Sequence, residues 1–441
     1  MIDTVKQTER EETAPPDAFL AGEPGPGPAW LQSARERARA RLGEIGFPTL
    51  RQEEWRFTNM APLLRWPLHA AQPGERRIGP ADVEPFRLAV NGHCLVFVDG
   101  FFRGDLSVLP GKGALQAGGL RALLEADGRE LEAHLARHAS FETNYFTALN
   151  TAFFQDGAYI SVPAGATIEE PVQLLYLAAS ERPGAAVQAR NLILVHSGGS
   201  LKVIETYASL TGAAHLTNAV TEASLGAGAR LEHCRLQNEN ERAFHVATVQ
   251  AAQGRESHWL SHSIATGARL ARNQIQTLLD GEGAEAILNG LYLGRGEQLI
   301  DHHTVVDHVQ PHCESHEFYH GILAGRAHGV FNGKIFVRPN AQKTNAKQTN
   351  RNLVLSEDAV MDTKPQLEIF ADDVKCTHGA TVGQLNGEAL FYLRARGIGA
   401  AQARSMLIRA FANDVVERVT LAGVRDHLDR LLDGRFENLE T

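Results

Sequence analysis

The segment NLILVHSGGSLKVIETYA, residues 191–208, decides the fold, because two short apolar runs are joined there by a Gly-Gly turn. The same texture continues in ASLGAGARLEHCRL (223–236), TVQAAQGRESHWL (248–260) and QTLLDGEGAEAILNGLYLG (276–294). Apolar residues alternate with a period near two, which is typical of β-strands, and the glycines mark the turns between them. We therefore expect a long succession of short strands in the middle of the chain.

The turn glycines recur at a regular interval. Gly198, Gly226, Gly254 and Gly281 are 28, 28 and 27 residues apart, and a repeat of that length built from short strands indicates a solenoid. No helix separates the strands, which argues against a doubly wound α/β sheet. The prediction is a mainly β fold, a right-handed parallel β-helix core flanked by N-terminal and C-terminal helical domains. Asn and Thr are expected at its corners, as in AQKTNAKQTNRNL (341–353). An antiparallel sandwich or barrel with chance spacing is the alternative.

Changes of composition divide the chain into four parts. They are a Pro/Gly-rich disordered leader (1–28), a mostly helical N-terminal domain (29–140), the parallel β-helix core (141–385) and a C-terminal helical domain (386–441). In the N-terminal domain, residues 51–64 and 114–139 are expected to be helical, and HCLVFVDGFF (93–102) a strand or hairpin. The C-terminal helices could cap the solenoid or present a face to a partner.

Composition excludes several classes of function. The net charge of −9 is unfavourable for binding nucleic acid or anionic membranes, which both require a basic face. No apolar run approaches the roughly 18 residues of a membrane span, and the first residues lack the apolar core of a signal peptide. The four cysteines lie far apart, which suits a reducing cytosol. GxxxxGK[ST], GxSxG and HExxH are absent, so we expect no P-loop ATPase in this chain.

Cys376 and His378 are the candidate metal ligands. Residues i and i+2 of a strand lie on the same face, with Cα atoms roughly 6.6–6.8 Å apart. A thiolate and an imidazole suit iron, iron–sulfur species or zinc. We expect the pair on the outward side of the last solenoid turn. Two ligands do not complete a site that needs four, so distant residues or a second protein must supply the others. Ordinary packing at a sheet end is the alternative.

Two further groups of polar residues are expected to lie outside the core. One is the histidine-rich stretch DHHTVVDHVQPHCESHEFYHGILAGRAH (301–328), whose histidines are expected to be solvent-exposed or at corners. There the adjacent His302 and His303 must face opposite sides of a strand, and transient iron binding is the alternative. The other is a basic group with local ion pairs, for which a phosphate site is the alternative; it consists of Lys334, Arg338, Lys343, Lys347 and Arg351.

The long segment GVFNGKIFVRPNAQKTNAKQTNRNLVLSEDAVMDTKPQLEIFADDVKCTHGATVGQLNGEALFYLRARGI (329–398) closely resembles the SufB/SufD family of iron–sulfur cluster assembly proteins. The match covers at least residues 300–400. PTLRQEEWRFTNMAPL (48–63), HGATVGQL (378–385) and the overall length resemble the SufD branch of that family. His303 and His308 look like family positions without an assigned role.

The resemblance implies a non-enzymatic scaffold subunit of a cytosolic SufBCD-type complex. A SufB-like paralogue would pair with it through the β-helices, and a SufC-type ATPase would dock on its C-terminal helical domain. A transient iron–sulfur cluster would form at the interface with the paralogue. This chain would bind no nucleotide, nucleic acid or membrane, and ATPase activity would belong to the partner. A homodimer of the isolated chain is a further expectation, because open sheet edges can self-pair.

The resemblance also assigns roles to residues. His378 corresponds to the histidine that contributes to the nascent cluster, and Cys376 matches the neighbouring family cysteine. The link between core and ATPase-docking helices corresponds to Phe391, Tyr392, Leu393, Arg394, Arg396, Gly397 and Ile398. Two alternatives stay open at this point: a β-helix carbohydrate-active lyase or hydrolase that uses paired carboxylates, and a homodimeric structural adaptor in which Cys376 and His378 are replaceable.

Overall fold

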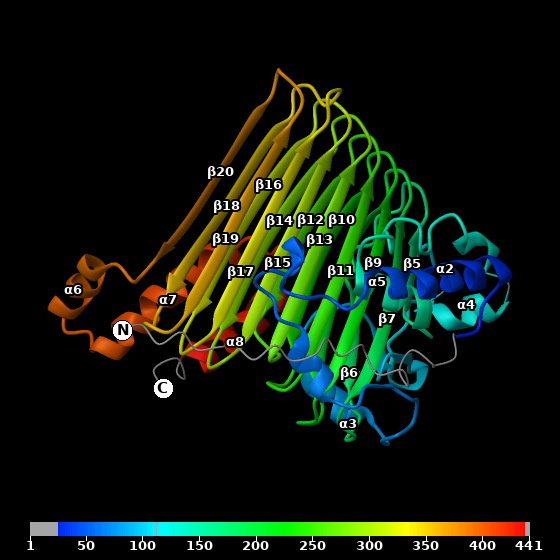
Figure 1. Cartoon of the computed structure of the whole chain (residues 1–441), viewed down its shortest axis with the longest axis horizontal. Helices are drawn as coiled ribbons and strands as arrows, with labels where there is room; N and C mark the ends of the chain where they lie inside the picture. The colour runs from blue at the N-terminus through cyan, green and yellow to red at the C-terminus, as the bar shows by residue number, and fades with distance from the viewer. Residues whose placement is uncertain (1–24, 112, 127, 437–441) are drawn as a thin grey trace.

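The computed structural model describes residues 25–111, 113–126 and 128–436, and its centre is a β-solenoid of about eight turns (Figure 1). Two ten-stranded sheets face each other, and successive strands of the core alternate between them. Neighbouring core strands within each sheet pair in parallel. The predicted mainly β fold with a parallel solenoid core is confirmed. Most of the expected leader lies outside the described residues.

The two sheets contain the following strands. Sheet A consists of β4 (Gln116–Gly119), β5 (Ala158–Val162), β7 (Ala185–Val195), β9 (His215–Leu225), β11 (Phe244–Gln253), β13 (Leu270–Leu279), β15 (Leu299–His308), β17 (His328–Val337) and β19 (Val360–Ile369), with β1 (His69–Ala70) beside β7. Sheet B consists of β3 (Phe101–Phe102), β2 (His93–Val98), β6 (Val172–Ala178), β8 (Ser200–Ser209), β10 (Arg230–Asn238), β12 (His258–Ala265), β14 (Glu285–Gly294), β16 (Glu314–Leu323), β18 (Asn345–Val354) and β20 (Lys375–Gly383).

Every second residue of a strand points into the space between the sheets. This interior is filled mainly by Leu, Val, Ile and Ala, with aromatic rings stacked from turn to turn. The ring of Tyr176 lies 4.5 Å from that of Phe97 and 5.1 Å from that of Tyr207, centroid to centroid. Much of each outer face is also buried, because helices pack on it. Both faces of both sheets therefore contribute to hydrophobic cores.

The glycine repeat marks one corner of successive turns. A Cβ atom at Gly226 would lie 2.6 Å from the Ser197 nitrogen, and one at Gly281 would lie 2.0 Å from the Arg255 nitrogen. Since real Cβ atoms do not approach backbone this closely, glycine lets one corner stack directly on the next. The interval that identifies the solenoid in the sequence is thus the length of one turn.

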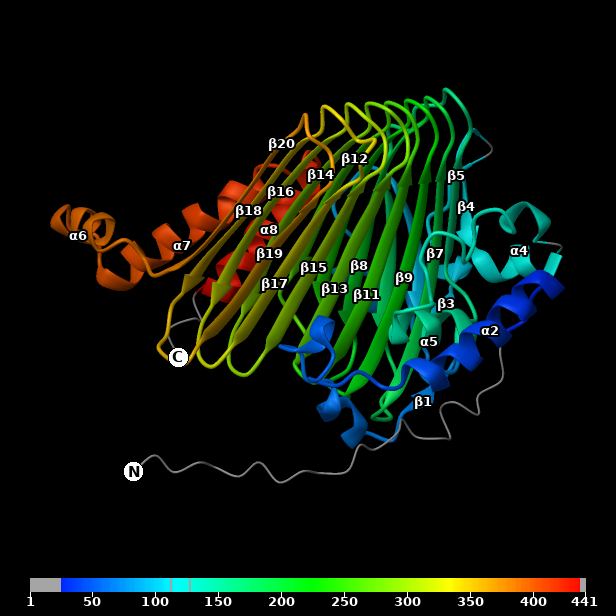
Figure 2. The same ribbon diagram turned by 45° about the horizontal axis from the view of Figure 1, so that its top comes forward.

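The N-terminal part covers the outer face of sheet A and also extends both sheets (Figure 2). Its helices are α2 (Ala29–Ile45), α3 (Pro80–Val83), α4 (Leu120–Ala126) and α5 (Tyr145–Phe153), with the 3₁₀ turns η1 (Glu53–Trp55), η2 (Ala61–Arg65), η3 (Glu84–Phe86), η4 (Gly104–Leu106) and η5 (Arg129–Leu131). The predicted hairpin at 93–102 is present, as β2 and β3 pair antiparallel. It belongs to sheet B through the pairing of β2 with β6.

Two helices expected in this part are shorter than predicted. Residues 51–64 form only the turns η1 and η2, where Pro62 lacks the N–H that a continuing helix requires. Residues 114–139 begin with strand β4, which contains Gly118 and Gly119, and glycine is a poor helix former. Tertiary contacts then hold η1 on the sheet: the guanidinium of Arg272 lies 3.9 Å from the ring of Trp55.

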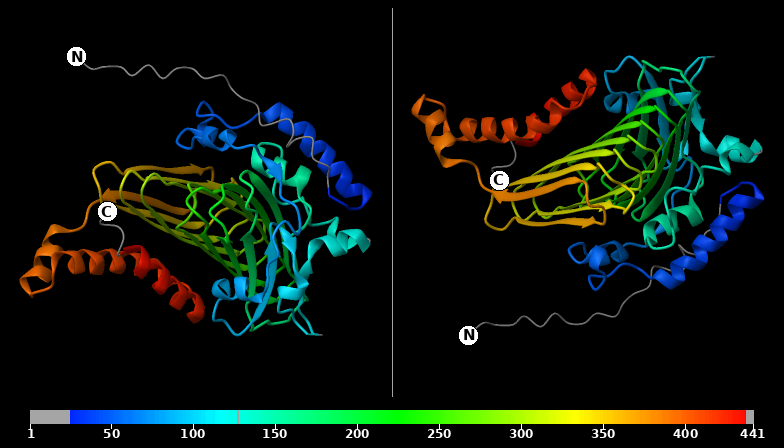
Figure 3. Two further views of the ribbon diagram at one scale, coloured as in Figure 1. Left: turned by 90° about the horizontal axis from the view of Figure 1, so that it is seen from below. Right: turned by 90° about the horizontal axis from the view of Figure 1, so that it is seen from above.

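Three helices follow the solenoid: α6 (Gly387–Ala395), α7 (Ala400–Val416) and α8 (Ala422–Phe436). Figure 3 shows α7 and α8 along one side of the solenoid and α6 standing away from it. The apolar side of α7 packs on β14 and β16 of sheet B. The helical prediction for this tail is confirmed. Helices α7 and α8 cover a face of sheet B and do not cap the end of the solenoid. The last strands, β19 and β20, stay exposed or half-buried along most of their length.

The expectation of Asn at the corners is wrong for two residues. Asn350 and Asn352 lie within β18 and are buried in the interior. The side-chain amide of Asn350 donates to the hydroxyl of Tyr292 at 3.0 Å. Thr344 does lie at a corner, where its hydroxyl donates to the Ala341 carbonyl oxygen at 2.8 Å. Hydrogen bonds to an interior tyrosine compensate the burial of these amides.

Candidate functional site

Cys376 and His378 lie on β20, the last strand of sheet B. Cys376 is in register with Ala346 of β18, and His378 is in register with Gln348. Both β18 residues are buried, and Cys376 packs against the interior core. Side chains in register on parallel strands point the same way. The predicted shared face is therefore correct, but the expected outward direction is wrong: the pair faces the interior at the open end of the solenoid.

The two side chains differ in solvent access. Cys376 is half-buried and His378 is exposed. Burial raises the pKa of the Cys376 thiol, although the Ala346 backbone partly offsets this effect. The sulfur is therefore a thiol at neutral pH, and a metal ion must displace its proton before it can bind. His378 can offer a ring nitrogen without any change in the fold.

The pair does not form a complete metal site within one copy of the chain. Among the described residues, no group of three or more His, Cys, Asp or Glu side chains is arranged to hold a metal ion. Iron in a cluster and structural zinc both require about four protein or sulfide ligands. A metal ion or cluster bound by this pair would need further ligands from outside the described part of the chain.

The strands around this pair are sheet edges. β19 ends sheet A and β20 ends sheet B, so one side of each strand has no neighbouring strand. Apolar side chains are exposed here, at Val360, Ile369, Phe370 and Val382. Pro365 lies in the middle of β19, a position that proline occupies in edge strands because it cannot donate to a ladder. Long uncovered edges with exposed apolar side chains are typical of surfaces that pair with another chain.

Helix α6 carries most of the predicted partner-binding residues. It begins at the cap residue Asn386, whose side chain accepts hydrogen bonds from the N–H groups of Glu388 and Ala389. None of its residues is buried, and the side chains of Phe391 and Tyr392 are 74% and 58% exposed. An aromatic face so far outside any core suits contact with another protein.

The other predicted partner-binding residues lie at the C-terminal end of α6 and in the turn that follows it. Gly397 adopts a φ of 85°, a left-handed conformation that ends helices and favours glycine. The guanidinium of Arg396 lies 3.8 Å from the ring of Tyr392. Leu393, Arg394 and Ile398 complete this turn, where the Ile398 N–H lies 3.4 Å from the Leu393 carbonyl oxygen. The whole predicted set thus forms one protruding helix and its C-terminal turn.

Four histidines of the 301–328 stretch are buried, so the expectation that they are solvated is wrong; they are His302, His303, His308 and His320. His302 and His303 do face opposite sides. The ring of His302 stacks inside the solenoid on Tyr292, whereas His303 lies outside, 3.1 Å from Asp301. Burial lowers the pKa of His302 to about 3. A neutral stacked ring has a structural role, so this histidine is not a free iron ligand.

Three residues of the basic group have the ion pairs that were expected for a solvated face. The ammonium of Lys334 lies 2.6 Å from Glu368, and the guanidinium of Arg338 lies 2.8 Å from Asp307. Lys343 pairs with Asp373. Carboxylates already occupy these cations, so the geometry gives no support to the phosphate alternative.

Sequence reasoning missed a polar cluster in the interior behind His378. Glu317 of β16 and Gln348 of β18 are buried and in register with each other. One carboxylate oxygen of Glu317 accepts hydrogen bonds from the Thr304 hydroxyl at 2.6 Å and from the Gln348 amide at 3.2 Å. Burial raises the pKa of Glu317 to about 7 despite these bonds. Only knowledge of which strand face is internal could have identified this cluster.

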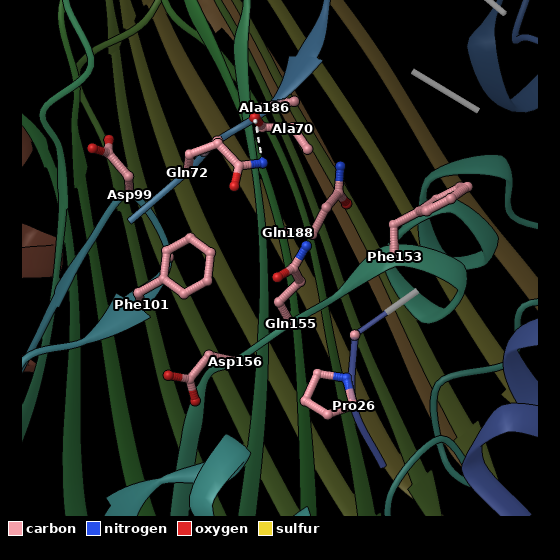
Figure 4. A pocket seen from close by; sticks show the side chains of 13 residues that line it. Pro26, Ala70, Gln72, Asp99, Phe101, Phe153, Gln155, Asp156, Ala186 and Gln188 are labelled. Atoms are coloured by element: carbon pink, nitrogen blue, oxygen red, sulfur yellow. Dashed lines mark hydrogen bonds between the residues drawn. The ribbon is translucent and has the colours of Figure 1, made fainter. Parts of the chain in front are cut away.

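A separate cavity of about 340 Å³ lies near β7, toward the other end of the solenoid from β20. Figure 4 shows the amide side chains of Gln72, Gln155 and Gln188 in it, near the carboxylates of Asp99 and Asp156. Both carboxylates accept hydrogen bonds from backbone N–H groups at 2.7–3.2 Å. They fix the surrounding loops, which is a structural role.

Comparisons with known proteins agree on one family. The description "SUF system FeS cluster assembly, SufBD core domain" matches residues 176–411, and "SufBD protein N-terminal region" matches residues 27–174. An iron–sulfur cluster assembly SufBD family protein of Synechocystis sp. is 34% identical over 92% of this chain and 91% of its own length. The iron–sulfur cluster assembly protein SufD of Escherichia coli is 32% identical, over 88% of this chain and 89% of that protein. SufD of Bacillus subtilis is 30% identical over 66% and 67%. Within the described residues, no helix has the length and apolar character needed to span a membrane.

Proposed function

The chain belongs to the SufBD family of iron–sulfur cluster assembly proteins, and from that premise we propose that it is a scaffold subunit that builds a nascent cluster together with a SufB-like paralogue. In this proposal the subunit itself neither binds nor hydrolyses ATP, in keeping with a sequence that lacks a phosphate-binding loop. A SufC-type ATPase supplies that activity in a cytosolic complex. The iron–sulfur cluster is cargo that leaves the complex after assembly.

One observation supports this proposal: the two candidate ligands lie together on the uncovered edge strand β20. Cys376 and His378 face the interior at the open end, and β19 and β20 lack a neighbour on one side. A partner that continues either sheet would bring its own ligands to the same opening. A paralogue fits best, because a second solenoid would present strands of matching length and spacing.

The exposed face of α6 is the proposed contact for the ATPase. The helix follows the end of β20 after a link of residues 384–386, and it contacts α7. A movement of α6 could therefore reach sheet B through the contact of α7 with β14 and β16. ATP hydrolysis in the SufC-type partner would act on the interface with the paralogue through α6, α7 and sheet B.

Replacing His378 by alanine is expected to lower the yield of cluster by at least about tenfold. The reason is the loss of one ligand from a site that has few. The measurement is anaerobic reconstitution of the complete complex with iron and sulfide, followed by visible absorption and by iron and sulfide analysis. Cys376→Ser tests the thiol in the same assay.

The matched control is His316→Ala, which removes a half-exposed histidine from the outer face of sheet B. It should leave the yield unchanged. A wild-type yield from His378→Ala would overturn the proposed site and would favour a purely structural adaptor. Isolation of the chain only with copies of itself would overturn the paralogue as partner. The matches to known proteins give no support to the carbohydrate-active alternative.

Replacing Phe391 by aspartate is expected to weaken ATPase binding by at least tenfold, because it places a carboxylate in an apolar contact. The melting temperature of the isolated chain should stay within about 1 °C, since this side chain lies outside every core. Titration of the ATPase by calorimetry measures the affinity. The control is Glu388→Gln on the same helix, and equal affinity of the Phe391→Asp variant and the wild type would exclude α6 as the docking surface.

A further inference from the structure

Three inward-facing polar residues follow one another on neighbouring strands of sheet B. Glu317 of β16 is in register with Gln348 of β18, which is in register with His378 of β20. Adjacent strands lie about 4.8 Å apart, so each side chain is next to the following one. Strands β16, β18 and β20 follow one another toward the open end of the solenoid (Figure 1), so the row ends at the proposed cluster ligand His378 on the edge strand.

The contacts within this row leave two side-chain oxygen atoms without a hydrogen bond. Gln348 donates its amide to one oxygen of Glu317 at 3.2 Å. Oε1 of Glu317 and Oε1 of Gln348 are buried and have no hydrogen-bond partner among the described residues. Leaving a buried acceptor unpaired is unfavourable, so such an atom points to a donor that comes close in another state of the protein.

The opposite sheet fixes the position of Gln348. Gly333 of β17 faces it across the interior, and a Cβ atom at Gly333 would lie 2.3 Å from Nε2 of Gln348. The amide therefore occupies the space that any other residue at position 333 would need. Together with the hydrogen bond to Glu317, this contact restricts the side chain to a defined place beside His378.

A histidine that binds a metal through one ring nitrogen usually donates its other N–H to a carbonyl or carboxylate oxygen, which fixes the ring and its tautomer. We propose that Oε1 of Gln348 accepts that N–H from His378, and that Glu317 holds Gln348 in the orientation this requires. Gln348 and Glu317 are then positioning residues for the ligand. This inference rests on the proposed function of His378 as a ligand to iron.

The tautomer of His378 tests the proposal without any cluster. In the full-length chain labelled with ¹⁵N-histidine, the His378 signals are assigned by their loss in His378→Gln. We expect one tautomer in the wild type. Gln348→Leu, of similar volume, should give a mixture of both tautomers, and Gln348→Glu, which keeps an acceptor, should restore one. The control Lys347→Gln changes the adjacent, outward-facing residue of β18 and should behave as wild type.

Iron(II) affinity of the assembled complex supplies a second measurement. Gln348→Leu is expected to weaken it about 10-fold to 100-fold, with a smaller loss for Gln348→Glu. Identical tautomers in the wild type and in folded Gln348→Leu would overturn the inference. If the tautomers are identical and His378→Gln still lowers the cluster yield, the proposed function stands and only the positioning role of Gln348 fails. If His378→Gln has a wild-type yield, the proposed function fails, whatever the tautomer.

Discussion

Replacing Glu222 by glutamine is expected to lower the free energy of unfolding by about 3–5 kcal/mol, because it leaves a buried arginine without its counter-charge. Glu222 and Arg190 are both fully buried, and the guanidinium reaches the carboxylate at 2.6 Å. The carboxylate also accepts four backbone N–H groups, at 2.7–3.0 Å, from residues 136–139. One side chain therefore binds the N-terminal part to sheet A.

The electrostatics support the direction of this effect. Burial by itself would raise the pKa of Glu222, but Arg190 and the backbone N–H groups more than offset it, so that the pKa is lowered. A lowered carboxyl pKa means stability that is present at neutral pH and is lost as the pH falls through the folded-state value. Ala136 has a φ of 58°, and this strained turn directs the N–H groups toward the carboxylate.

Urea unfolding at pH 7 measures the loss for Glu222→Gln, and hydrogen exchange of residues 136–139 reports it locally. The double variant Arg190→Met with Glu222→Gln removes both charges and should be less destabilised than the sum of the single variants. The exposed pair of Arg326 and Glu297 is the matched control, and Glu297→Gln should cost under about 1 kcal/mol. A loss for Glu222→Gln no larger than for this control would refute the prediction.

Replacing Glu317 by glutamine is expected to stabilise the protein in a pH-dependent manner. Burial raises the pKa of this carboxyl from 4.5 to about 7. Between these pH values the folded chain holds a proton that the unfolded chain has lost, so stability falls as the pH rises and the loss is complete above about pH 7. A difference of about 2.5 pKa units corresponds to about 3 kcal/mol. Glutamine does not titrate and avoids this cost.

The measurement is the difference in unfolding free energy between Glu317→Gln and the wild type, taken from pH 4.5 to pH 8.5. It should rise in favour of the variant by about 3 kcal/mol across that range. Other titrating groups are common to both proteins and cancel. The control Glu314→Gln, on the same strand and exposed, should give a difference within about 0.5 kcal/mol throughout. A flat difference for Glu317→Gln would show that this carboxyl titrates normally in the folded state.

The sequence located the candidate site but could not orient it. The two-residue spacing of Cys376 and His378 determines that they share a face, because a strand alternates sides with a period of two. It does not determine which face, since helices also bury much of the outer side of both sheets. When both faces are apolar, the alternation of polar and apolar residues no longer identifies the inside.

The buried histidines follow the same principle. His302 and His320 look solvated in the sequence because histidine is frequent at surfaces, and only their packed neighbours give them another role. His302 stacks on Tyr292 of β14, which belongs to the opposite sheet, and Nδ1 of His320 lies 2.9 Å from the Phe411 carbonyl oxygen of α7. These neighbours come from the opposite sheet or from the C-terminal helices.

By itself, the amino-acid sequence determined the solenoid, the length of its turn and the helical tail, since each of these depends on local periodicity and on glycines at fixed intervals. Only the tertiary structure decided that Glu317, Gln348 and His378 form one row, because residues about 30 positions apart become neighbours only when successive turns stack in register. The open end has the same origin. A strand is an edge strand when no further strand pairs with one of its sides. That property depends on the assembled sheet and is not encoded at any one place in the linear sequence.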